Sequence, residues 1–170
     1  LVRLADAKGR VLAVGSASAT NPLAARIFRI QEAPLDAAFF GERFKAALEL
    51  RKLLGLWEPE GGCRWIFGEG DGLPGLVVDR YAHALVLHVG TAGLEACRDA
   101  WWPVLQELAR AEGLETFVER SVSGRKDEGL PAENRILKGS LAGPVVIREG
   151  AARLSVDLLK GQKTGFFLDQ

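Results

Sequence analysis

The sequence has few cysteines, no long apolar run and no signal-peptide layout. Cys63 and Cys97 stand among 170 residues without metal-type spacing, so we expect two reduced, buried thiols and no disulfide scaffold. No apolar stretch approaches the roughly 18 residues that a membrane span needs. The richest stretch, 82–89, is interrupted by His83 and His88. These absences predict a cytoplasmic protein without membrane contact.

An excess of charge of either sign is also missing. Lysine plus arginine and aspartate plus glutamate number 22 each, so no global basic charge indicates nucleic acid, and RNA contact would need a local patch. A hydrophobic fraction of 48% and a charged fraction of 26% are typical of a folded chain and exclude a mostly disordered one. The chain also lacks methionine altogether, and we expect it to be a piece of a longer protein.

Residues 1–33 are predicted to be β-structure. Short strand-like runs at 1–4 and 10–14 flank a turn with Gly9, and 26–30 has the pattern of a third strand. Three short strands bury little core by themselves, so this segment is expected to be the end of a small β-domain.

Residues 34–61 are predicted to be a connecting helix and linker. Asp36 is a suitable N-cap, and 58–62 is rich in glycine, proline and glutamate. Apolar residues recur at helical spacing and are expected to face the core, a partner-binding helix being the alternative; they are Phe40, Phe44, Ala47, Leu50, Leu54 and Trp57.

Residues 62–158 are predicted to form a central α+β domain with a mostly antiparallel sheet. A helix is expected over 93–111, kinked or divided at Pro103, followed by a polar loop over 121–134 and a hairpin that turns at Glu149-Gly150. The expected strands are 63–67, 76–79, 84–89, 116–118, 145–148 and 153–158.

Familiar catalytic motifs are missing. There is no Gly-x-Gly-x-x-Gly, no Gly-x-Ser-x-Gly and no metal-spaced cluster, and the Lys163-Thr164 pair lacks the glycine spacing of a phosphate-binding loop. The acidic, glycine-rich stretch 69–75 does not match a calcium loop, so a wide turn between strands is expected. His83 and His88 are expected on opposite faces, as surface and packing residues.

Two polar stretches are candidates for ligand contact. Arg120, Arg125 and Lys126 belong to a basic, hydroxyl-bearing loop that could contact phosphates, although solvated loops have the same composition. Residues 160–170 form a cationic, glycine-flanked segment that could line an anionic or carboxylate-bearing ligand. A plain strand-to-helix connection explains that segment equally well.

Three segments, taken together and in order, resemble the motifs of one family. They are 68–81, Glu119-Arg120 with Glu128-Gly129-Leu130, and the final decapeptide 161–170. The chain resembles the PUA-domain-containing, S-adenosylmethionine-dependent methyltransferases of large-subunit ribosomal RNA that act on carbon 5 of cytosine.

This resemblance implies an organisation and a role. Residues 1–33 would be the later part of a PUA-like RNA-binding barrel, 62–158 the central α+β domain, and 159–170 the entry to a Rossmann-like methyltransferase domain beyond Gln170. Ribosomal RNA of the large subunit would be the partner and S-adenosylmethionine the cofactor. The resemblance assigns Lys163, Thr164, Gly165 and Phe166 to the cofactor side and Asp169 and Gln170 to orienting that loop.

The family's chemistry uses a cysteine thiolate that attacks carbon 6 of the base. Cys63 and Cys97 lie in the wrong domain for this role, so we expect no catalytic residue here and no activity of these 170 residues alone. Two alternatives stay open: a stand-alone RNA-binding or assembly module, and a homodimer formed through Trp101 and Trp102.

Overall fold

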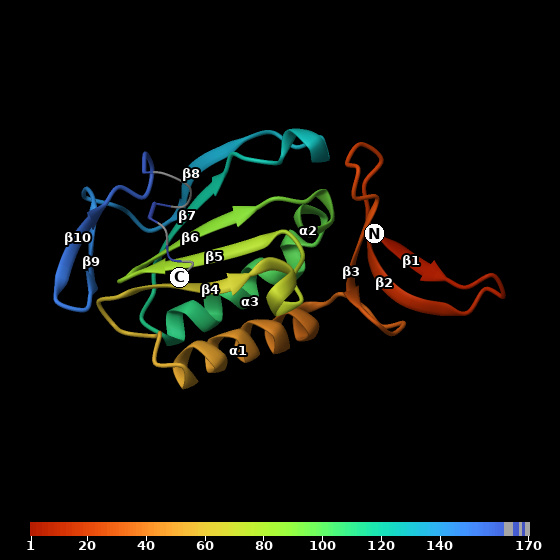
Figure 1. The fold of residues 1–170 in the computed structure, drawn as a ribbon, viewed down its shortest axis with the longest axis horizontal. Helices are drawn as coiled ribbons and strands as arrows, with labels where there is room; N and C mark the ends of the chain where they lie inside the picture. Colours follow the sequence, from red (N-terminus) through yellow and green to blue (C-terminus); the bar gives the residue numbers. More distant parts are fainter. Residues whose placement is uncertain (162–164, 167, 169–170) are drawn as a thin grey trace.

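The N-terminal segment forms a three-stranded antiparallel sheet (Figure 1). The computed structural model describes residues 1–161, 165, 166 and 168. The strands are β1 (Val2–Ala5), β2 (Val11–Ala17) and β3 (Ala25–Arg29), in the order β1-β2-β3. Gly9 takes φ +81° in the first turn, a conformation that favours glycine. The three predicted strands are confirmed. Within the described residues the sheet is open and no barrel closes, so the PUA-like assignment stays a prediction.

Helix α1 (Ala37–Leu53) begins where its cap was predicted. A side-chain oxygen of Asp36 accepts a hydrogen bond from the Phe39 amide at 3.0 Å. Phe40 and Phe44 are fully buried, but Leu50 and Leu54 are 45% and 60% exposed. The predicted core stripe is therefore wrong at its C-terminal end, because these leucines line an open groove beside strand β4 (Gly62–Phe67).

The central unit is a five-stranded sheet in the order β4-β5-β6-β7-β8. All neighbours pair antiparallel except β6 and β7, which are parallel. A parallel pair needs a long crossover, which the two helices α2 and α3 supply. The mostly antiparallel α+β fold is confirmed. The bounds are β4 (Gly62–Phe67), β5 (Leu76–Tyr81), β6 (Ala84–Val89), α2 (Ala92–Ala96), α3 (Arg98–Ala111), β7 (Thr116–Ser121) and β8 (Glu133–Lys138).

Two details of the central unit differ from expectation. The predicted helix is divided at Cys97, not at Pro103, which lies inside α3. Proline has no amide hydrogen for the carbonyl one turn earlier and its ring crowds that carbonyl, yet α3 continues through this position. The segment predicted as a loop over 121–134 ends in strand β8, whose polar sequence is that of an edge strand with little burial. Between β7 and β8 lies the short 3-10 helix η2 (Lys126–Glu128).

Helices α1 and α3 cover one face of the five-stranded sheet (Figure 1). Trp65 and Trp101 are fully buried in this layer, and their indole nitrogens donate to backbone oxygens at 3.1 and 2.9 Å. The half-buried Trp102 packs edge to face on Phe117, with ring centroids 5.2 Å apart. Both adjacent tryptophans thus contact the core, and the homodimer that was predicted through them stays a prediction.

The predicted closing hairpin is confirmed and packs near the other face of the sheet. Strands β9 (Val145–Glu149) and β10 (Ala152–Val156) form a separate two-stranded sheet. Val145, Ile147 and Val156 are buried in a second cluster that includes Tyr81 and sheet residues from β6 and β7. Figure 1 shows this hairpin at the end of the molecule opposite the N-terminal sheet.

A buried carboxylate helps to fix the N-terminal sheet to the central unit, in addition to Phe28, which is buried in the main core. Glu128 accepts hydrogen bonds from Asn21 Nδ2 at 2.9 Å, Arg26 Nη1 at 2.8 Å and the Ala92 amide at 3.1 Å. Next to it, a Cβ atom added to Gly93 would lie 2.1 Å from Ser16 Cβ. Strand β2 can therefore approach α2 this closely only because residue 93 is glycine.

The acidic stretch 69–75 is a turn, as predicted. Its first part is the 3-10 helix η1 (Gly68–Asp71), in which Asp71 forms a two-fold hydrogen-bonded ion pair with Arg51 at 2.6 and 2.8 Å. Among the described residues no group of three or more metal-ligating side chains gathers. No helix in that part of the chain is long and apolar enough to cross a membrane.

Candidate functional site

The candidate site lies on the sheet face opposite the helices, where the described residues of the C-terminal segment (157–161, 165, 166 and 168) pack near Tyr81. Tyr81, at the end of β5, is fully buried there. Its hydroxyl donates to the Phe166 carbonyl and accepts from the Phe166 amide, both at 3.0 Å. A side chain 85 positions earlier therefore holds both backbone groups of one predicted cofactor-side residue.

Two glycines permit close backbone packing here, Gly165 against Tyr81 and Gly161 against its own turn. Gly165 has φ +136°, and a Cβ atom there would lie 3.0 Å from Val156 Cγ1 and 3.3 Å from Tyr81 Cζ. A Cβ atom on Gly161 would lie 2.6 Å from the Asp157 carbonyl oxygen. A larger residue at 165 would crowd Tyr81 and Val156, and one at 161 would clash with the Asp157 carbonyl of its own turn.

An aspartate shapes the turn before these glycines. Asp157 Oδ1 accepts hydrogen bonds from the amides of Leu159 and Lys160, both at 2.9 Å. The bonds from Lys160 and Leu159 lower the pKa of Asp157. Asn134 Nδ2 donates to the Leu159 carbonyl at 3.1 Å, so the turn is also tied to β8.

Arg120 lies on this face of β7 with unused hydrogen-bond donors. Its Nε and Nη1 atoms are buried and find no hydrogen-bond partner in the part of the chain that the structure describes. Its positive charge contributes to lowering the pKa of Asp157. On the adjacent strand, burial lowers the pKa of His88, and its Nδ1 lies 3.2 Å from the Arg120 carbonyl oxygen. Arg120 is half-buried, and leaving buried donors without a partner is costly, which makes Arg120 a candidate for contact with an anionic ligand.

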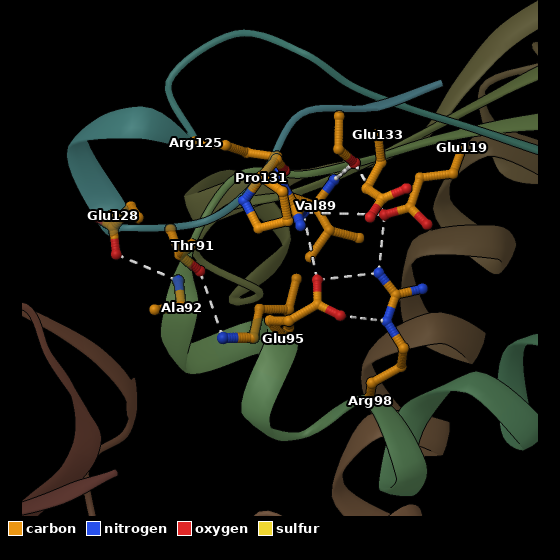
Figure 2. A network of polar contacts seen from close by, with 12 residues as sticks. Val89, Thr91, Ala92, Glu95, Arg98, Glu119, Arg125, Glu128, Pro131 and Glu133 are labelled. Atoms are coloured by element: carbon orange, nitrogen blue, oxygen red, sulfur yellow. Dashed lines mark hydrogen bonds and ion pairs between the residues drawn. The ribbon is translucent and has the colours of Figure 1, made fainter. Parts of the chain in front are cut away.

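The other face of β7 carries a buried charge network (Figure 2). Glu119 is fully buried, and its Oε1 accepts from Arg98 Nη2 at 2.7 Å and Ser121 Oγ at 3.0 Å. Arg98 also forms a two-fold ion pair with Glu95 at 2.6 and 3.0 Å. Burial alone would raise the pKa of Glu95, but the hydrogen bonds and charges of Arg98 and Arg125 outweigh it and lower that pKa.

The three predicted RNA-contacting residues do not share one surface. Arg125 is 2% exposed and donates to the carbonyls of Pro131 and Val89 and to Glu95, so it organises the β7–β8 loop from inside (Figure 2). Lys126 is exposed at the start of η2. Its RNA contact and those of Arg120 and Arg125 stay predictions.

The predicted cofactor-side residues are described in part. Gly165 and Phe166 lie against Tyr81 as given above, whereas Lys163 and Thr164 lie outside the described residues, as do Asp169 and Gln170. Sequence reasoning did not single out Tyr81, although it closes the motif 68–81 on which the family resemblance rests. The place of Tyr81 at the end of this motif was the signal in the sequence that could have identified it.

Both cysteines are free and buried, as predicted. Burial raises the pKa of the Cys63 thiol to about 11 and also raises the pKa of Cys97. A thiol with such a pKa is protonated at neutral pH and is a poor nucleophile. Neither cysteine is therefore suited to nucleophilic catalysis.

Comparisons with known proteins identify relatives along almost the whole chain. No family model matches it. It is 38% identical over 165 residues to a protein of Shewanella denitrificans named ribosomal RNA large subunit methyltransferase I, which covers 95% of this chain. It is 34% identical over 171 residues to a Yersinia pseudotuberculosis protein of the same name, which covers 99% of it.

Solved structures share the fold. A protein from Streptococcus mutans, described as a SAM-dependent methyltransferase, superposes with a TM-score of 0.80 at 20% identity and covers 99% of this chain. A methyltransferase complexed with SAH gives a TM-score of 0.81 at 19% identity over the same share. The chain spans 41 to 43% of the curated relatives described above and 42% of these two structures. It is thus similar, along nearly its whole length, to about two fifths of proteins named ribosomal RNA large subunit methyltransferase I.

Proposed function

We propose that this chain is part of an S-adenosylmethionine-dependent methyltransferase that acts on large-subunit ribosomal RNA. The observation that carries the proposal is the 34 to 38% identity, over 95 to 99% of the chain, to proteins whose name states that activity. The proposal has a finer part, namely that the methylated atom is carbon 5 of a cytosine. In this protein the 170 residues place RNA and contribute one segment to the cofactor side.

S-adenosylmethionine supplies an electrophilic methyl group when it is bound. Lys163, Thr164, Gly165 and Phe166 would hold it from this chain. One observation supports an anionic ligand on this face of the sheet, namely the donors of Arg120 that find no partner among the described residues. Tyr81 engages the backbone of Phe166, so its task is to hold the segment in place.

Arg120 and Lys126 are proposed to contact RNA, and Arg125 to support the loop that carries Lys126. Arg120 lies on the same side of the sheet as the C-terminal segment, and Lys126 is exposed. The nucleophilic thiolate is proposed to come from outside this chain, because the raised pKa of Cys63 and the burial of Cys97 favour the neutral thiols.

The test uses the complete natural protein and unmodified large-subunit RNA transcribed in vitro. We expect radiolabel from the methyl group of S-adenosylmethionine to enter this RNA and not small-subunit RNA, and nucleoside mass spectrometry to identify 5-methylcytidine. The double variant C63A/C97A should retain activity. Failure to transfer label would contradict the proposal, whereas another methylated nucleoside would contradict only the carbon-5 part. A 170-residue piece that binds RNA as tightly as the whole protein, without transfer, would favour the stand-alone module.

A further inference from the structure

A second basic site lies at the far end of the central unit, between its sheet and the β9–β10 hairpin. There a cavity of about 530 Å³ opens between the linker before β4, the β5–β6 turn, the end of α3 and the hairpin. This volume is typical of small-ligand sites. The charged and ring-nitrogen groups that line it are Glu60, Arg80, His83, Glu112, Arg148 and Arg153.

Arg80 is a buried cation in the wall of this cavity. It is 5% exposed, its Nε donates to the Ala82 carbonyl at 3.0 Å, and its Nη2 donates to the Pro59 carbonyl at 2.9 Å. The guanidinium carbon lies 4.4 Å from the centre of the Trp57 ring. The remaining nitrogen, Nη1, is buried and has no hydrogen-bond partner among the described residues. Arg80 is thus held in position with one donor unused.

Two more arginines face each other across the hairpin. Arg148 and Arg153 are directly opposite partners in the β9–β10 ladder, and both are exposed. No ion pair involves either of them in the part of the chain that the structure describes. Like charges directly opposite each other destabilise an antiparallel pair. A local arrangement that costs stability is expected at functional sites.

The nearby carboxylates offset this cluster only in part. Glu112 is already occupied, since its two oxygens accept from Lys52 Nζ at 2.6 Å and Trp57 Nε1 at 2.9 Å. Glu60 lines the cavity with the three arginines, and the charges of Glu112 and Glu58 also act on Arg80. The exposed His83 adds ring nitrogens that can hydrogen-bond a ligand. Of the charged side chains that line the cavity, three are arginines and two are glutamates, and the two exposed arginines Arg148 and Arg153 have no ion pair among the described residues.

We propose that the cavity lined by Arg80, Arg148 and Arg153 binds a backbone phosphate of the RNA substrate, an inference that rests on the proposed function. Arginine guanidinium groups match phosphate oxygens in geometry and charge. Two of the three arginines are exposed on a hairpin that lies at the end of the molecule (Figure 1), where a long polyanion can reach them. Phosphate contacts of this kind set the position of RNA without reading its sequence.

The experiment measures RNA affinity of the complete protein against salt concentration, for the wild type and for R148A, R153A and R153E. Each lost phosphate contact should weaken RNA binding about tenfold and reduce the slope of log K against log salt by about one. The control is K45A, which removes an exposed positive charge from α1 and should change neither quantity. Thermal unfolding with added inorganic phosphate tests whether the free ion binds by itself.

The R153E variant separates binding from folding. A glutamate opposite Arg148 converts a repulsive pair into an attractive one, so we expect a higher Tm together with weaker RNA binding. Unchanged affinity and slope in R148A and R153E would overturn the inference, and Tm elevation by phosphate without any effect on RNA would replace it with a free-phosphate site. If the wild-type protein neither binds nor methylates ribosomal RNA, the proposed function itself is wrong. This outcome differs from one in which the wild type binds RNA and the arginine variants bind it equally well, which contradicts only the phosphate site.

Discussion

Glu128→Gln should release the N-terminal sheet from the central unit without unfolding the latter. Glu128 and Arg26 form an ion pair at 2.8 Å with side chains 3% and 16% exposed. Neutralising one member of a buried pair costs about 3 kcal/mol. The glutamine amide also cannot accept from all three donors that Glu128 now serves, namely Asn21, Arg26 and the Ala92 amide. About 3 kcal/mol corresponds to roughly a hundredfold larger population of the undocked state.

Hydrogen exchange in the complete protein measures this effect directly. Amides of β2 and β3 should exchange about a hundredfold faster in E128Q, while amides of β5 and β6 keep their protection. The control is E49Q, since Glu49 is exposed on α1. Exchange of β2 and β3 within twofold of the wild type would refute the reasoning, because it would mean that Glu128 does not hold the sheet.

Three further outcomes are expected in the same protein. Tyr81→Phe removes both hydrogen bonds to the Phe166 backbone and should cost about 2 kcal/mol of local stability. The measurement is hydrogen exchange of the Phe166 amide, which should become faster; an unchanged exchange rate would contradict this. Gly93→Ala places a methyl group 2.1 Å from Ser16 Cβ and should lower the free energy of unfolding in urea by about 1–3 kcal/mol. Adding Ser16→Gly should restore part of this stability, and no restoration would point to another cause. Burial lowers the pKa of His88 from 6.5, so protonation favours the unfolded state. The native state should keep its full stability above pH 6.5 and lose stability as the pH falls below this value, because His88 is protonated more readily in the unfolded chain. In His88→Asn the Tm should therefore change less between pH 8 and pH 5 than in the wild type.

The elements with strong local signals could be predicted from the sequence. Asp36 caps α1 because its side chain reaches an amide three residues away, and Gly150, with φ +57°, permits the hairpin turn. Both effects depend on residues that are neighbours in sequence. The strands β4, β5 and β6 likewise follow from apolar runs that stop at turn residues.

The candidate site could be predicted only in outline. Arg120 and Arg125 are five positions apart, and composition treats them alike. Tertiary structure leaves Arg120 with unused donors and engages Arg125 with Val89 and Glu95. The fold decides which carbonyls and carboxylates lie near an arginine, and these decide which of its donors stay unused. The local composition of the sequence does not contain this information.

The sequence by itself determined the N-cap of α1, the hairpin turns and most of the alternation of strands and helices, because these depend on contacts within a few residues. Only the tertiary structure decided that β8 completes the sheet, that β6 and β7 run parallel, and that Arg80 meets Arg148 and Arg153 across one cavity. These arrangements join segments far apart in the chain. Their free energy comes from burial and charge that exist only once the sheet has formed.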